Sequence, residues 1–133
     1  MNEAYVTYHP YTAMTSTNIL SCSNGLNGLQ NKYGLVDINS IFPMVAAFSD
    51  APWNSTNCGG CYRLHSRYTT TSIDVTVVDF LPPSNSSDFF DLSFEAFKVL
   101  FGDKGVHDGR AIADWEKISE GICQRTICRK KRK

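Results

Sequence analysis

The chain has 133 residues, of which 42% are hydrophobic and 20% are charged. This size and composition predict one folded domain and exclude a disordered chain or a large multidomain enzyme. The apolar runs are short and interrupted, which excludes a transmembrane helix. The first residues lack the basic segment and apolar stretch of a secretory signal, so we expect Met1 to open a mature chain.

The net charge of zero conceals an uneven distribution. Six of the 13 basic residues follow Cys123, and the rest of the chain holds 7 basic against 13 acidic residues, a net charge of −6. An acidic body is a poor general partner for nucleic acid, because phosphate contacts need Lys and Arg on the folded surface. We expect residues 1–123 to form the domain and residues 124–133 a basic, disordered tail: an appended tag, a solvated terminus or a binder of anionic surfaces.

The first third of the chain contains three apolar segments. Ala4–Tyr8 is rich in residues that favour strands and predicts a first strand. Asn24–Gly34 carries two leucines and a tyrosine at spacings of three and four, which predicts a short helix bounded by glycines. Asp37–Phe48 is apolar, and Pro43 interrupts it.

The middle of the chain predicts two strands and a loop. The strands are Cys61–Tyr68 and Ser72–Phe80, and in the second the apolar residues alternate with polar ones, so that one face belongs to the core. Residues 81–88 (LPPSNSSD) have the composition of a loop.

The last third predicts a helix followed by a strand. Leu92–Phe101 carries an apolar stripe at helical spacing, with Ser93 as its cap and Gly102 as its end. Gly109–Cys123 is ambiguous, with Trp115 placed on a final strand. Several short strands with two short helices predict a mainly β fold, a small β-barrel.

Five cysteines, at positions 22, 58, 61, 123 and 128, form two pairs and one remainder. Cys58 and Cys61 have the C-x-x-C spacing of zinc ribbons and redox sites, but no second metal-binding pair follows and no βαβ pattern surrounds them. Structural disulfides, one from each of these two cysteines, are the favoured interpretation. Sequons at Asn54 and Asn85 agree with export into an oxidising compartment, and an exposed Cys128 is open to an intermolecular bridge.

Three segments together resemble the cerato-platanin family of small secreted fungal proteins. They are Cys22–Leu29 (CSNGLNGL), Trp53–Tyr62 (WNSTNCGGCY) and Val77–Asp79 (VVD), and the resemblance runs from about Ala4 to Cys123. It implies a six-stranded double-psi β-barrel like barwin and the first domain of expansins. It also implies two disulfides, Cys22–Cys58 and Cys61–Cys123.

The same resemblance implies a function at the cell wall. It predicts a secreted protein with a shallow groove that binds chitin or N-acetylglucosamine oligomers, and possibly cellulose, without hydrolysing them. It predicts loosening of cellulosic material, an elicitor or effector activity towards plants, and a possible plant receptor as partner. Nothing in the sequence matches a phosphate-binding loop, a dinucleotide fingerprint or a metal cage, so we expect no cofactor and no metal. We also expect a monomer or weak dimer.

Two aspartates are the central candidates for the groove. Asp79 ends a predicted strand and Asp91 precedes a predicted helix, so a loop can bring both carboxylates to one edge, the pair that glycoside hydrolysis requires. In Phe90-Asp91-Leu92-Ser93 the chain departs from the family and resembles a string of expansins and related barrel endoglucanases, in which the Asp is the general acid. The alternatives are that Asp91 caps the helix and that Asp79 satisfies backbone donors.

The residue expected at the base position opposes catalysis. In the barrel endoglucanases the base is an Asp on the first strand, and the corresponding stretch here contains His9, an awkward substitute or simply a solvated imidazole. We therefore predict binding without hydrolysis. The alternative is a weak glycoside hydrolase or lytic transglycosylase with Asp91 as general acid, assisted by Asp79.

Sugar sites combine flat aromatic faces with fixed polar groups. Tyr8 and Tyr11, beside the first strand, are the predicted aromatic groove residues, whereas Trp53 is expected to be structural, next to the disulfides. Asn24 and Asn27 are predicted to donate amides to sugar hydroxyls, with turn or cap residues as the alternative.

Overall fold

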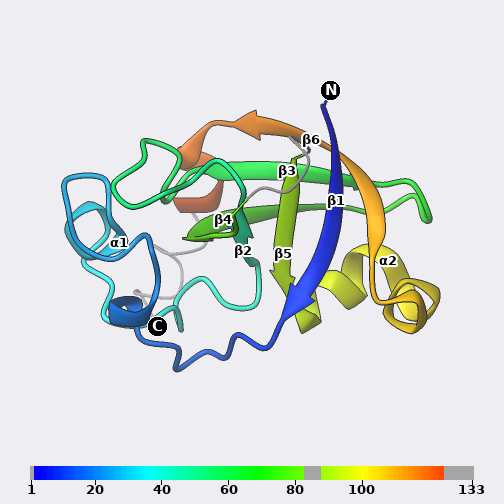
Figure 1. Ribbon diagram of the computed structural model, residues 1–133, viewed down its shortest axis with the longest axis horizontal. Helices are drawn as coiled ribbons and strands as arrows, with labels where there is room; N and C mark the ends of the chain where they lie inside the picture. Colours follow the sequence, from blue (N-terminus) through cyan, green and yellow to red (C-terminus); the bar gives the residue numbers. More distant parts are fainter. Residues whose placement is uncertain (1, 83–87, 125–133) are drawn as a thin grey trace.

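The computed structural model describes residues 2–82 and 88–124. Six strands close into a barrel in the order β1-β5-β2-β4-β3-β6. The strands are β1 (Asn2–His9), β2 (Val45–Phe48), β3 (Cys61–Ser66), β4 (Ser72–Phe80), β5 (Phe89–Ser93) and β6 (Ala111–Ile118). The helices are η1 (Thr17–Ile19), α1 (Leu29–Lys32) and α2 (Phe94–Asp108). α2 lies at one end of the barrel, and the loops that carry α1 lie at the opposite end (Figure 1).

The pairing of the strands identifies the type of barrel. β1 pairs with β5, and β2 with β4, in parallel, while the four other pairs in the ring are antiparallel. This mixed ring is a six-stranded double-psi β-barrel, so the predicted fold class is confirmed. The four strands expected from the sequence correspond to β1, β3, β4 and β6.

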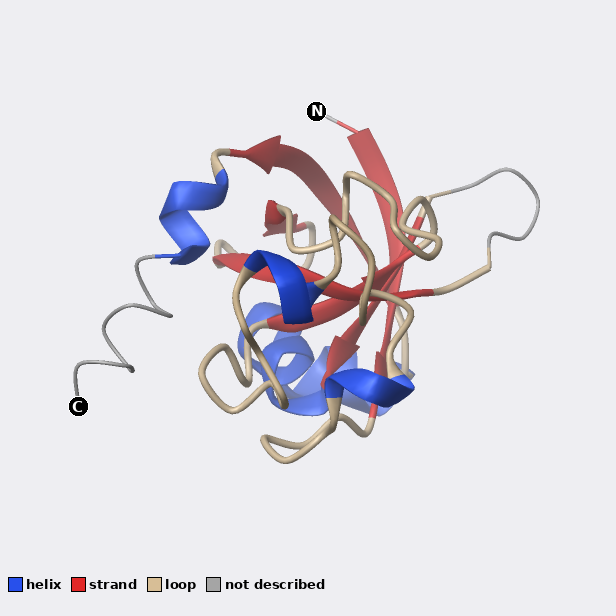
Figure 2. Cartoon of the chain, turned by 90° about the vertical axis from the view of Figure 1, so that its left-hand side faces the viewer, coloured by secondary structure: helices blue, strands red, loops and turns tan. Residues whose placement is uncertain are grey.

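The barrel encloses an aromatic core. Phe48 and Phe90 stack with ring centroids 4.5 Å apart, and Tyr62 and Trp115 pack against this pair. In the first half of β4, buried Ile73 and Val75 alternate with partly exposed Asp74 as predicted, but the alternation ends there, because Thr76 and Val78 are also buried. Figure 2 shows the strands wrapped around this interior with the helices outside it.

The helix expected from Leu92 is longer than predicted. The predicted cap is confirmed, because the Ala96 N–H donates to the Ser93 hydroxyl at 3.0 Å, but the helix begins at Phe94 and not at Leu92, which belongs to β5. Helical geometry is interrupted at Gly102, the predicted end, whose φ is 71°, but a second helical segment follows as far as Asp108. The end lies at Gly109, whose φ of 78° is the left-handed conformation typical of a helix terminus.

Residues 89–93, for which no strand was predicted, form β5. Asp91 therefore lies within a strand, and the alternative that it caps the helix is wrong, since Ser93 does so. The helix expected over 24–34 shortens to α1, because the preceding residues form a compact loop in which the Leu29 N–H donates to the Cys22 carbonyl. Residues 83–87 of the predicted loop, the Asn85 sequon and the predicted tail from residue 125 lie outside the described residues.

Two disulfides tie the loops to the barrel. Cys22–Cys58 has a Cα–Cα distance of 5.4 Å, and Cys61–Cys123 has one of 5.7 Å. These are the pairs that the family resemblance implies. The first joins the loop before α1 to the segment that leads into β3, and the second joins β3 to the residues after β6.

Candidate functional site

The two central aspartates lie in one row across three strands. Ala47 on β2 is in register with Asp91 on β5 and with Asp79 on β4. Neighbouring strands are about 4.8 Å apart, so the two Asp Cα atoms lie roughly 10 Å from each other. Ala47 is the only residue between them in this row; its side chain is a single methyl group, and the residue is buried, at 3% exposed.

Asp79 is held by three donors. Its Oδ1 accepts from the backbone N–H groups of Ser21 and Phe80, both at 2.9 Å, and its Oδ2 accepts from the Tyr11 hydroxyl at 3.0 Å. Burial, and then the neighbouring Asp79 carboxylate, raise the pKa of Tyr11, so this phenol stays a hydrogen-bond donor. The structure thus brings Tyr11 and Asp79 together, and the prediction that Asp79 satisfies backbone donors is confirmed.

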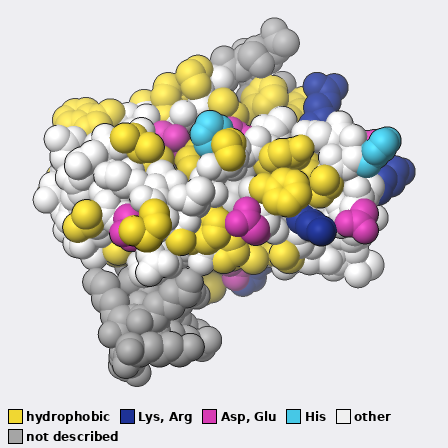
Figure 3. All heavy atoms as spheres, turned by 90° about the horizontal axis from the view of Figure 1, so that it is seen from below, with side chains coloured by type: hydrophobic (Ala, Val, Ile, Leu, Met, Phe, Trp, Pro, Cys, Tyr) yellow, Lys and Arg dark blue, Asp and Glu magenta, His cyan; other side chains and the backbone are white. Residues whose placement is uncertain are grey.

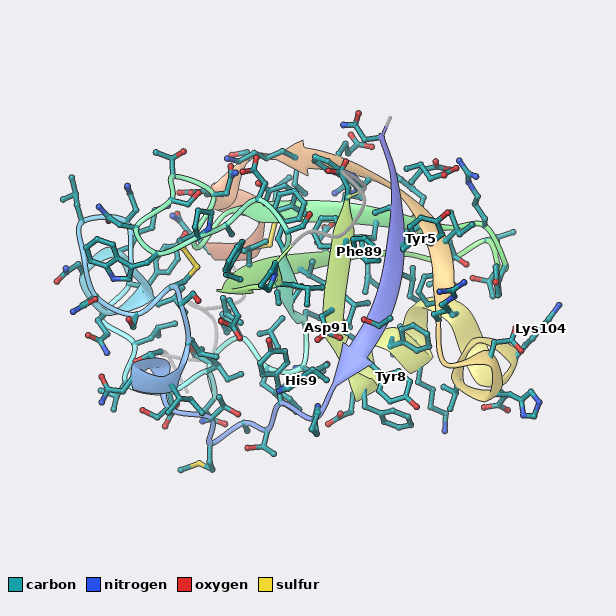
Figure 4. The ribbon with its side chains drawn as sticks, in the orientation of Figure 1. Tyr5, Tyr8, His9, Phe89, Asp91 and Lys104 are labelled. Carbon is teal, nitrogen blue, oxygen red and sulfur yellow. A yellow bond between two sulfur atoms is a disulfide. The ribbon has the colours of Figure 1, made fainter. Side chains whose placement is uncertain are left out.

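Asp91 is partly buried and accepts fewer hydrogen bonds than Asp79. Its side chain is 14% exposed, and its Oδ1 accepts from the Thr7 hydroxyl at 2.9 Å. The His9 Nδ1 lies 3.8 Å from its Oδ2, and the His9 ring contacts the Tyr11 ring at 4.7 Å. Burial raises the pKa of Asp91, against the smaller lowering effects of Thr7 and His9. Figure 4 shows Asp91 and His9 close together beside β1.

An aromatic pair lies next to this row, two residues earlier on β1 and β5. Tyr5 stacks on Phe89, with ring centroids 5.5 Å apart and an interplanar angle of 30°, two residues before Thr7 on β1 and Asp91 on β5. Sequence reasoning did not single out Phe89. The period of two in a strand, applied to residues 5, 7 and 9, places Tyr5 on the face of His9, but the partner on β5 depends on a pairing that the local sequence does not contain.

Tyr8 does not belong to this face. It alternates with Thr7 and His9 along β1, and its ring packs on Phe94 at 5.2 Å and on Phe97 at 5.0 Å, both in α2. In Figure 4 it points away from His9 and Asp91. The structure therefore does not bring Tyr8 to the two aspartates, because successive residues of a strand point to opposite faces.

Asn24 and Asn27 contact the loop around Trp53 and not the aspartates. Trp53 donates its ring N–H to Asn24 at 2.7 Å, and the Asn27 side-chain amide donates to the Asn54 carbonyl at 3.1 Å. Trp53 is 60% exposed, and its structural role next to the disulfides stays a prediction. A role of the two asparagines in sugar binding stays a prediction.

The two carboxylates have no Lys or Arg partner among the described residues. Within residues 2–82 and 88–124, neither Asp79 nor Asp91 forms an ion pair with Lys or Arg. In Figure 3, hydrophobic and acidic side chains lie interspersed across the underside of the molecule, and most of the Lys and Arg visible there lie in its right half. In the same ranges no group of three His, Cys, Asp or Glu side chains is placed to hold a metal ion, and no helix is long and apolar enough to cross a membrane.

The six-stranded double-psi barrel is a fold that this chain shares with solved cerato-platanins and expansins. The profile of the cerato-platanin family matches residues 4–125, and the chain belongs to that family. Among curated relatives, Allergen Asp f 15 of Aspergillus fumigatus is 35% identical over 121 residues, which cover 89% of this chain and 75% of the allergen.

Solved structures agree with this assignment. Cerato-platanin 3 of M. perniciosa superposes with a TM-score of 0.81 at 25% identity, over 92% of this chain and 98% of that one. An expansin of Clavibacter michiganensis, solved in complex with cellohexaose, superposes with a TM-score of 0.59 at 16% identity, over 88% of this chain and 50% of that one. The second likeness concerns the fold alone.

Proposed function

We propose that this protein is a secreted, non-catalytic cell-wall protein that binds β-linked glucose or N-acetylglucosamine oligomers across the row Asp79–Ala47–Asp91. The observation that carries the proposal is the pair of carboxylates on either side of a short side chain, neither of which has a Lys or Arg partner among the described residues. Carboxylates accept hydrogen bonds from sugar hydroxyls, and Thr7 and Tyr11 orient them. The expansin complex with cellohexaose supports the sugar class.

Binding alone accounts for the wall-loosening activity that the family resemblance implies. A row of hydrogen bonds and ring contacts competes with the contacts between polymer chains, so the chains slip without cleavage. The same groove, by holding chitin fragments, also changes what a plant perceives. Secretion is supported by the two disulfides, which persist in oxidising compartments.

The test is an amide NMR titration with chitotetraose, using cellotetraose for comparison. We expect shifts confined to Asp79, Asp91 and the residues around Thr7, and the sugar with the tighter binding identifies the natural class. Asp91→Asn is expected to weaken binding at least tenfold. Asp114→Asn is the matched control, because it makes the same substitution on the other side of β1 and should leave binding unchanged. Equal binding by both variants, or no shifts with either sugar, contradicts the proposal.

A weak glycoside hydrolase is the second candidate, favoured by one observation. Burial raises the pKa of Asp91, as a general acid requires. Against it, Asp79 has three donors on its oxygens, and His9 occupies the position expected for a base. Reducing ends released from soluble chitin or cellulose derivatives, and their loss in Asp91→Asn, are the results that would establish an enzyme; we expect none to be released.

Elicitor activity is tested separately from sugar binding. We expect Asp79→Ala to lose oligomer binding and, with it, the response of plant tissue to the applied protein. A response that survives the loss of binding indicates recognition by a plant receptor through another surface.

A further inference from the structure

A hollow of about 170 Å³ lies beyond the aromatic pair of the groove. It is lined by Tyr5, Tyr68, Arg110, Ala111 and Ile112. Tyr5 belongs to both features, because its ring stacks on Phe89 and also lines the hollow. Phe89 precedes Asp91 by two residues, a distance of about 7 Å along a strand. The hollow is therefore a continuation of the proposed groove.

Two tyrosines from distant parts of the chain form the walls. Tyr5 lies on β1, and Tyr68 lies in the turn between β3 and β4, where it is 43% exposed. Tyr68 is held in place by an edge contact with Phe101 at 5.8 Å and by a hydrogen bond from its backbone N–H to the Ser66 hydroxyl at 2.9 Å. In the part of the chain that the structure describes, neither phenol hydroxyl has a protein hydrogen-bond partner, so both remain available to a ligand.

Arg110 supplies an unpaired positive charge at the rim. The nearby acids Glu3 and Asp114 are already bound by Arg67, at 2.6 and 2.7 Å. Among the described residues no carboxylate lies within ion-pair distance of Arg110, which is exposed, and its guanidinium lies 5.9 Å from the Tyr5 ring. A free guanidinium beside aromatic walls matches the planar carboxylate of a ligand with two parallel hydrogen bonds.

We propose that this hollow is a second subsite, which binds the uronic acid residue of a β-linked acidic polysaccharide. The sugar ring lies between the two tyrosines, and Arg110 binds its carboxylate. The proposal deepens the proposed function, since it extends the same groove, but its chemistry differs: the row at Asp91 offers carboxylates to hydroxyl groups, whereas this end offers a cation to an anion. The body of the protein is acidic, so a free arginine in such a hollow favours one charged ligand group over general attraction of anions.

The experiment compares two oligomers that differ only in the group at C6, a hydroxymethyl in one and a carboxylate in the other. Cellotetraose and its counterpart oxidised at every C6, a tetramer of β-1,4-glucuronic acid, are titrated into the wild-type protein while amide shifts are recorded. We expect the acidic tetramer to bind at least tenfold more tightly, to shift the amides of Tyr68 and Ile112, and to lose this advantage at high salt. Arg110→Gln should abolish the advantage. Lys98→Gln removes one exposed positive charge on α2 outside the hollow, so it should retain the advantage.

The outcomes separate the subsite from the groove. Equal affinity for the two tetramers, or an equal loss in Arg110→Gln and Lys98→Gln, overturns the subsite proposal, the second because it indicates only general electrostatics. Failure of the groove appears differently, as the absence of shifts at Asp79 and Asp91 with any neutral oligomer. The fold of each variant is checked by its amide spectrum without sugar.

Discussion

Asp91 and Asp114 flank the same strand and differ in the partners of their carboxylates. Asp91 pairs through β5 with Thr7, and Asp114 pairs through β6 with Glu3, both residues of β1. Asp91 has a hydroxyl and a distant imidazole as partners. Asp114 is bound by two nitrogens of Arg67, at 2.7 and 3.2 Å.

The same contrast holds for the other charged residues on the two sides of β1. On the Asp114 side, ion pairs repeat across β3, β4 and β6, including Arg63–Asp74 at 2.8 Å and His65–Glu116 at 3.0 Å. On the Asp91 side, carboxylates accept from neutral donors only, the His9 contact apart. Acidic residues alone therefore do not mark a site; what marks this one is that its carboxylates are partly buried and, among the described residues, have no Lys or Arg partner.

The largest expected difference comes from the disulfides. Replacing Cys22 and Cys58 by Ser frees a loop of 36 residues and should lower the free energy of unfolding by about 4 kcal/mol. It also releases Ser21, whose N–H donates to Asp79, so sugar binding should fall in the fraction that remains folded. Urea unfolding and an oligomer titration measure the two effects.

The matched control removes the other disulfide, Cys61–Cys123, which closes a longer loop but touches none of the donors of Asp79. A similar loss of stability with sugar binding retained is the expected result. If both double variants lose binding to the same extent, the link between the first disulfide and the site is wrong.

The next difference concerns hydrogen bonds. Asp79→Ala leaves the Tyr11 hydroxyl and the backbone N–H groups of Ser21 and Phe80 without their acceptor, which should cost about 1–3 kcal/mol of unfolding free energy because half-buried donors are left unsatisfied. Asp114→Ala should change the urea midpoint little, since exposed ion pairs contribute little.

Asp79→Asn distinguishes charge from hydrogen bonding in the same experiment. The amide oxygen still accepts from Ser21 and Phe80, but its NH₂ group faces the Tyr11 hydroxyl, so most of the stability should return. A variant as unstable as Asp79→Ala shows that the negative charge itself is required.

Features that depend on residues close together in the sequence could be predicted from it, whereas those that depend on distant residues could not. Local signals sufficed for the cap at Ser93 and for the alternation in the first half of β4, and the family motifs implied the disulfides and the barrel. They did not suffice after Gly102: the glycine interrupts the helix as predicted, but a second helical segment follows, in which Gly105 packs against Phe101.

The site divides along the same line. Asp79 and Asp91 were found from motifs and spacing, whereas the stacking of Tyr5 on Phe89 depends on the register between strands 84 residues apart. Tyr8 was assigned to the groove because it neighbours the first strand. Tyr8 and buried Val6 lie on the same face of β1, and this face meets α2. The contact of Tyr8 with α2 could not be predicted without knowing where that helix lies.

The smallest effects are the pH dependences of the two aspartates, which should have opposite signs. Burial raises the pKa of Asp91 above 3.8, so the folded protein binds this proton more tightly than the unfolded chain, and this group adds stability as the pH falls through its folded pKa. Arg67 lowers the pKa of Asp114 below 3.8. Its stabilising effect is fully present above the unfolded pKa and is lost as the pH falls through the folded value.

Carboxyl NMR titrations of Asp91 and Asp114 measure these pKa values directly. Urea unfolding at pH 7 and pH 4, on Asp91→Asn and Asp114→Asn, measures their effect on stability. When the pH falls from 7 to 4, the wild-type protein should gain stability relative to Asp91→Asn and lose stability relative to Asp114→Asn. If the pKa values of Asp91 and Asp114 are shifted in the same direction from their ordinary value, the two carboxylates do not differ as described. The reason for placing sugar binding on the Asp91 side of β1 is then lost.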